Sequence, residues 1–119
     1  MTRVNRKIRT GYPDRVIEQL REDVKLYTSD HSVFKIGRTS DPDSRAKDPK
    51  YVREYKEMIV IYRTMSAAYA DDVERDLIAS FEKCDNFRGG GGGPHGQPPY
   101  YVYVVRRKSF WQSILSIFK

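Results

Sequence analysis

The sequence predicts one α+β domain, and three observations support this expectation. The chain has 119 residues, of which 39% are hydrophobic, so it can bury one modest core. Runs rich in β-branched and aromatic residues alternate with segments whose apolar residues recur at helical spacing. Glycine and proline residues separate several of these segments, and no internal repeat divides the chain.

The N-terminal third is expected to hold an arm, a helix and a hairpin. Residues 1–12 read as a mobile arm with four basic side chains, Arg3, Arg6, Lys7 and Arg9. A short helix should begin at Pro13 and run to Asp23, because one apolar stripe recurs along it. The runs 24–29 and 32–38 are both β-prone and lie only a few residues apart, so they predict a β-hairpin.

A capped turn follows the second of these runs. Asp41 is a good N-cap with Pro42 at the first helical position, and Pro49 should end this helix of about two turns. Arg45 would therefore lie on a short helix directly after a strand.

The second half of the chain is expected to hold the central strand and the longest helix. Residues 58–64 form the most strand-like run of the sequence. Ser66 should then cap a helix that continues to about Cys84. On a helical wheel, Glu74 falls inside the apolar arc of that helix, where an unpaired carboxylate would be costly. Either an ion pair with an arginine or a contact with water at the edge of the core would explain it, and so would a role as metal ligand.

The C-terminal part combines a loop, a strand and a tail. Residues 86–99 are rich in glycine and proline and must form a loop, which either connects two elements or closes on backbone phosphates. Residues 100–105 should form another strand. The tail, 106–119, is basic and aromatic, with apolar residues at helical spacing. It would pack on the core, dock to another protein or lie on a membrane surface.

Charge and cysteine content limit the function classes. The formal net charge is +6, which suits a polyanionic partner such as nucleic acid or an anionic membrane, although it also suits simple solubility. Cys84 is the only cysteine, and no segment resembles a signal peptide, so we expect an intracellular protein of the cytoplasm, nucleus or a virion that is not secreted. No apolar run approaches the ~20 residues that cross a bilayer, so no transmembrane segment is expected.

One motif points to a family. Residues 35–45 read KIGRTSDPDSR, and Glu74 follows them on the longest predicted helix. Together with the predicted strand pair, these features resemble the GIY-YIG nuclease superfamily, especially its compact phage- and virus-associated branch with a KIGxTxxPxxR signature. The resemblance extends over about residues 24–105.

The resemblance implies a fold and a set of site residues. The fold would be a small antiparallel β-sheet of about three to four strands flanked by helices. Glu74 would hold one divalent metal, Mg²⁺ or Mn²⁺, and Tyr27 would deprotonate water. Arg45 would stabilise the phosphate and Asn86 would orient the site. Lys35 stands where many relatives carry a second tyrosine, so it would replace that group's hydrogen bond or lower the pKa of Tyr27.

The resemblance also sets the functional hypotheses. The first is an endonuclease domain that hydrolyses DNA phosphodiester bonds with one divalent metal, with DNA favoured over RNA. Six basic residues would contact the nucleic acid: Arg6, Lys7, Arg9, Arg38, Arg45 and Arg88. The alternative is a catalytically degenerate protein of the same fold, acting as a nucleic-acid-binding or structural subunit of a larger assembly such as a virus. In either case the aromatic residues of 110–119 offer a contact for a protein partner, and a membrane-surface protein anchored by the tail is the third possibility.

Overall fold

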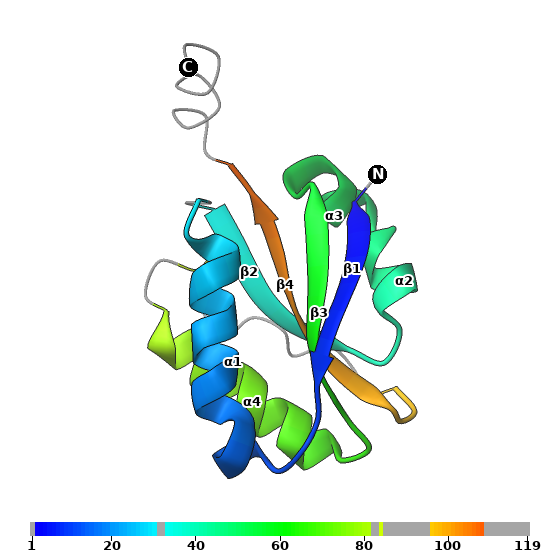
Figure 1. The fold of residues 1–119 in the computed structure, drawn as a ribbon. Helices are drawn as coiled ribbons and strands as arrows, with labels where there is room; N and C mark the ends of the chain where they lie inside the picture. Colours follow the sequence, from blue (N-terminus) through cyan, green and yellow to red (C-terminus); the bar gives the residue numbers. More distant parts are fainter. Residues whose placement is uncertain (1, 31–32, 82–83, 85–95, 109–119) are drawn as a thin grey trace.

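The fold is built on one mixed four-stranded sheet. A computed structural model describes residues 2–30, 33–81, 84 and 96–108. The strands are β1 (Arg3–Arg9), β2 (Val33–Thr39), β3 (Glu57–Thr64) and β4 (Tyr100–Arg107), in the spatial order β1-β3-β4-β2. Strand β1 runs parallel to β3, whereas β4 runs antiparallel to both of its neighbours (Figure 1).

Helices cover both faces of this sheet. Helices α1 (Pro13–Thr28) and α4 (Ala67–Ser80) pack on one face, called here the α1/α4 face, as Figure 1 shows. The shorter helices α2 (Pro42–Ala46) and α3 (Pro49–Glu54) belong to the opposite, α2/α3 face. Side chains alternate between the two faces along each strand, so every inner strand contributes to two apolar clusters. No helix in the described ranges is long and apolar enough to cross a membrane.

The expected α+β class and the two later strands are confirmed. Strand β3 lies inside the sheet and its residues 57–62 are buried, as expected for the most strand-like run. Strand β4 contains the predicted run 100–105 and extends to Arg107. The expectation of an antiparallel sheet is wrong in one respect, because β1 adds a parallel pair.

The expected N-terminal arm is instead strand β1. Val4 and Ile8, which stand among the basic residues of this strand, pack against the apolar cluster of the α2/α3 face. The buried Thr2 hydroxyl lies 3.1 and 3.0 Å from the carbonyl oxygens of Tyr51 and Tyr55 in and after α3, so these two acceptors share its one proton. Because the pairing partner β3 lies some fifty residues later, local composition carries little sign of it.

The predicted hairpin of runs 24–29 and 32–38 is wrong. Residues 24–28 continue α1, because Val16, Leu20 and Val24 recur at intervals of four and are all buried. Strand β2 therefore pairs with β4, near the C-terminus, and not with the run just before it. This difference moves Tyr27 from a strand to the last turn of a helix.

The capped turn after β2 is confirmed in its first half. The Asp41 carboxylate accepts a hydrogen bond from the Ser44 amide at 3.1 Å and begins α2. The expected two-turn helix is divided, however, because Asp48 caps a second helix through the Lys50 amide at 2.9 Å. Pro49 was expected to end the helix that begins at Pro42. That helix instead ends at Ala46, and Pro49 is the first residue of α3.

The longest predicted helix begins where expected. The Ser66 hydroxyl accepts a hydrogen bond from the Tyr69 amide at 3.2 Å, which confirms the predicted N-cap of α4. This helix ends at Ser80, earlier than the predicted end near Cys84. Most of the predicted loop, 86–95, and the aromatic part of the tail, 110–119, lie outside the described residues.

Candidate functional site

Four side chains from four elements meet on the α2/α3 face. Arg45 comes from α2, Tyr51 from α3, Lys35 from β2 and Tyr103 from β4. The Tyr51 and Tyr103 hydroxyl oxygens are 2.6 Å apart and share a hydrogen bond. Arg45 donates from Nη1 to the Tyr103 hydroxyl at 3.4 Å, and the Lys35 ammonium lies 5.5 Å from the centre of the Tyr51 ring. We call this group the Arg45 cluster.

A glycine makes this arrangement possible. Gly37 lies opposite Tyr103 in the β2–β4 ladder, and a Cβ atom at Gly37 would stand 2.3 Å from the Tyr103 hydroxyl oxygen and 2.5 Å from ring atom Cζ. The tyrosine ring therefore lies directly over the glycine. The glycine of the KIG motif is thus needed for the close approach of the ring that Arg45 contacts.

We expect Gly37→Ala to lower the free energy of unfolding by about 1–3 kcal/mol, because the new methyl group displaces the Tyr103 ring. Urea denaturation followed by circular dichroism measures this. In a Tyr103→Leu background the same substitution should cost much less, since the ring is gone. An equal cost in both backgrounds would show that Gly37 matters for another reason.

The electrostatics of the Arg45 cluster favour an anion. Burial, together with the nearby Tyr51, raises the pKa of Tyr103 far above its usual range, so this hydroxyl is protonated at neutral pH. Among the described residues, no carboxylate lies within 4.0 Å of the charged groups of Arg45 or Lys35. Within the described part of the chain, these two cations therefore lie beside hydroxyl groups and form no direct ion pair.

Glu74 forms a second group on the α1/α4 face. Glu74 is only 5% exposed, as its position in the apolar arc of α4 predicted. The Nε atom of Arg38 lies 3.3 Å from Oε1 of Glu74. The Nη2 atom of the same arginine lies 3.6 Å from a carboxylate oxygen of Asp71. The other Glu74 oxygen, Oε2, is buried and has no hydrogen-bond partner among the described residues. The expected ion pair with an arginine is therefore present, but the second oxygen of the carboxylate has no hydrogen-bond partner among the described residues.

The two groups lie within electrostatic reach of each other. Burial raises the pKa of Glu74 to about 7, and the nearby Asp71 adds to the rise, while Arg38, Lys35 and Arg45 oppose it. Lys35 faces α2 and α3, whereas Arg38 faces α4, since side chains alternate along β2. The sheet therefore brings Lys35, Arg45 and Glu74 near one another, but from opposite faces.

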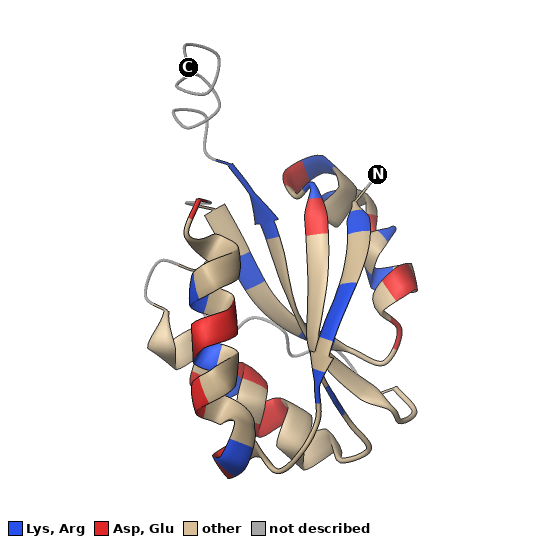
Figure 2. Cartoon of the chain, in the orientation of Figure 1, with Lys and Arg blue, Asp and Glu red and all other residues tan. Residues whose placement is uncertain are grey.

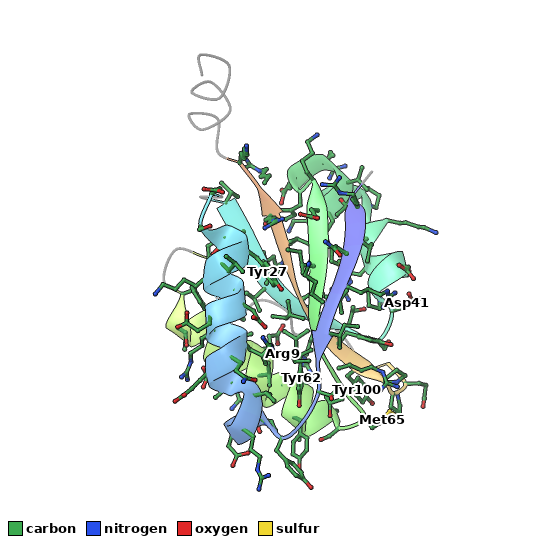
Figure 3. All side chains as sticks on the ribbon, viewed as in Figure 1. Arg9, Tyr27, Asp41, Tyr62, Met65 and Tyr100 are labelled. Carbon is green, nitrogen blue, oxygen red and sulfur yellow. The ribbon has the colours of Figure 1, made fainter. Side chains whose placement is uncertain are left out.

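Tyr27 is not part of this arrangement. It lies half-buried in the last turn of α1, on the α1/α4 face (Figure 3). Its carbonyl accepts a hydrogen bond from Arg106, which also forms an ion pair with Glu57. Burial raises the pKa of the Tyr27 hydroxyl, with Asp23 adding to the rise, which is the wrong direction for a base. The structure thus does not place Tyr27 beside Arg45.

The remaining predicted residues are divided over the molecule. Arg6 forms an ion pair with Asp43 at 3.1 Å on the α2/α3 face, and Arg9 pairs with Asp23 of α1. Lys7 is exposed on β1. The other two, Asn86 and Arg88, lie outside the described residues.

Sequence reasoning missed Tyr51 and Tyr103. The alternation in the run YYVYVV does place Tyr101 and Tyr103 on one face of a strand. It cannot say which strand lies beside them, and that pairing is what brings Tyr103 over Gly37. Tyr51 follows Pro49 on a helix that the sequence did not predict, so nothing marked it as a site residue.

Comparisons of this chain with protein-family models, with curated proteins and with solved structures find no match.

Proposed function

We propose that this protein is a metal-dependent nuclease whose phosphate-binding site is the Arg45 cluster. The observation that carries the proposal is the pair of cations, Arg45 and Lys35, held beside two hydrogen-bonded tyrosines without a paired carboxylate among the described residues. The likeness of residues 35–45 to the nuclease signature supports the same assignment. A net charge of +6 is compatible with nucleic acid as the polyanionic partner.

In this proposal Arg45 binds the phosphate that is cut. Its guanidinium is half-buried and is oriented by the Tyr103 hydroxyl, so part of its donor set is fixed before a ligand arrives. A planar guanidinium donates two parallel hydrogen bonds to phosphate oxygens, and negative charge on those oxygens grows in the transition state. Lys35 adds a second positive charge on the same face.

In this proposal Tyr103 replaces Tyr27, the tyrosine that the family resemblance implies. It lies on β4, which runs antiparallel to the KIG strand, and its hydroxyl contacts Arg45. Because the pKa of Tyr103 is raised, its role here is to accept the hydrogen bond from Arg45 and so orient that guanidinium, not to remove a proton from water. Tyr51 holds the Tyr103 hydroxyl in position through their shared hydrogen bond.

Glu74 is the residue that would hold Mg²⁺ or Mn²⁺. Its buried Oε2 atom has no hydrogen-bond partner among the described residues, which suits a ligand atom. Within those residues no group of three His, Cys, Asp or Glu side chains gathers, but Mg²⁺ usually keeps several waters and is often bound by only one or two carboxylates. When bound, the metal would supply Lewis-acid stabilisation and a more acidic water.

The test is cleavage of a supercoiled plasmid by the purified protein with Mg²⁺, Mn²⁺ or EDTA. We expect nicked product only with a divalent metal. Absence of cleavage with every metal, combined with retained DNA binding that needs Arg45, would favour the second candidate, a nucleic-acid-binding protein without catalysis. The contact between Arg38 and Glu74 Oε1 is the observation that favours this candidate, because it partly neutralises the proposed metal ligand.

A further inference from the structure

An open pocket lies at the end of the sheet where β1 and β3 finish. Its volume is about 280 Å³, and it is lined by Thr10, Tyr12, Arg63, Thr64, Met65 and Tyr69. Two large apolar residues of this pocket are unusually exposed to solvent: Tyr12 is 58% exposed and Met65 is 62% exposed. Figure 3 labels Met65 at this end of the molecule. The pocket is thus an apolar surface exposed to solvent and separate from the Arg45 cluster.

The wall formed by Tyr12 is held in place by the backbone. Gly11 adopts φ +125°, a conformation that side-chain-bearing residues rarely adopt, and its carbonyl accepts a hydrogen bond of 2.6 Å from the buried Tyr62. The Tyr12 and Tyr69 rings then meet edge to face, 5.8 Å apart and at 75°. This preformed aromatic corner would lose little conformational entropy on binding a planar ligand.

Charge indicates the chemistry of the occupant. Arg63 lines the pocket, is exposed and has no ion pair with any described residue, and the Arg15 guanidinium lies 5.9 Å from the centre of the Tyr12 ring. Aromatic faces beside free positive charge suit a nucleobase with its phosphate, because the ring stacks and the phosphate pairs with arginine. The volume is slightly below the range of drug-sized ligand sites, which fits a single ring system.

Neighbouring residues of the sheet lie between this pocket and the Arg45 cluster. Arg63 is paired with Tyr101 across the β3–β4 ladder, and the Arg6 guanidinium lies 5.9 Å from the centre of the Tyr101 ring. Tyr101 in turn packs against the apolar cluster that contains Tyr103. Lys and Arg positions also recur along β1 in Figure 2. Arg63, Tyr101 and the cluster that contains Tyr103 therefore form a series of neighbours that leads from the pocket toward the Arg45 cluster.

We infer that this pocket receives one unpaired base of the nucleic acid, so the preferred substrate carries a single-stranded segment beside the phosphate at Arg45. This inference rests on the proposed function and names its substrate class. Because stacking of one base adds to the affinity, a tailed duplex should bind about tenfold more tightly than a blunt one.

Fluorescence anisotropy tests the inference, with labelled DNA and EDTA present to prevent cleavage. The probes are a blunt duplex and the same duplex with a single-stranded tail of about ten nucleotides at either its 5′ or its 3′ end. Wild type should prefer one tailed probe about tenfold. Tyr12→Ala and Arg63→Gln should lose most of that preference while binding the blunt duplex nearly as before.

Two matched controls lie on α1, away from the pocket. Leu26 is 68% exposed, like Tyr12, and Lys25 is an exposed cation, like Arg63, so Leu26→Ala and Lys25→Gln should keep the preference. Equal affinity of wild type for all probes, or an equal loss for blunt and tailed probes in Tyr12→Ala, would overturn the inference. A different result would show that the proposed function itself is wrong: Arg45→Ala would then bind every probe as tightly as wild type does.

Discussion

Arg45→Ala should reduce metal-dependent DNA cleavage by at least about a hundredfold. The guanidinium is the group that we expect to meet the charge developing on the phosphate, and no other described arginine contacts the Tyr103 hydroxyl. Single-turnover cleavage of a labelled DNA strand, with enzyme in excess, measures the chemical step apart from product release.

Two further variants separate the causes of that loss. Lys47→Ala removes an exposed cation directly after the same helix, and it should leave the rate within about twofold of wild type. Arg45→Lys keeps the charge but not the planar fork, so its rate should lie between those of wild type and Arg45→Ala. A wild-type rate in Arg45→Ala would remove Arg45 from the site.

Glu74→Gln should change both the pH dependence of stability and the metal-dependent reaction. The pKa of Glu74 is raised to about 7 by burial, so the folded protein keeps this proton over a pH range in which the unfolded chain has lost it. The free energy of unfolding should therefore fall as pH rises from about 4.5 to about 7, by on the order of 2 kcal/mol from this group.

The neutral amide of Gln cannot titrate, so Glu74→Gln should lack that part of the fall. Urea denaturation at several pH values measures the difference between the two proteins, and Asp72→Asn, an exposed acid on the same helix, should follow wild type. Glu74→Gln should also abolish cleavage, since it removes the proposed metal ligand. If the free energy of unfolding depends on pH in the same way for wild type and Glu74→Gln, then burial does not raise the pKa of Glu74 as described above.

Local signals in the sequence were enough for several parts of the fold. The caps Asp41 and Ser66 predicted the starts of two helices, because a capping side chain acts on amides only a few residues away. The helical wheel likewise placed Glu74 in the buried face of α4, since the period of a helix is fixed.

The errors came from contacts between distant parts of the chain. Residues 3–9 look like a basic arm until β3 provides a parallel partner, and residues 24–28 look like a strand although Val24 completes the apolar stripe of α1. The same limit applied to the site. Tyr103 meets Gly37 only because β4, near the C-terminus, pairs with β2. The sequence therefore identified Arg45, Lys35 and Glu74 as candidates, but it placed Tyr27 on a strand although this residue lies in α1, and it did not point to Tyr103.

The most direct test of the account compares Tyr103→Phe with Tyr27→Phe in single-turnover cleavage of the same DNA. Tyr103→Phe removes the hydroxyl that contacts both Arg45 and Tyr51, so we expect a rate at least about tenfold below wild type. Tyr27→Phe should cut at the wild-type rate, because its side chain lies on α1. A large loss in Tyr27→Phe with an unchanged rate in Tyr103→Phe would contradict the assignment of the site to the Arg45 cluster.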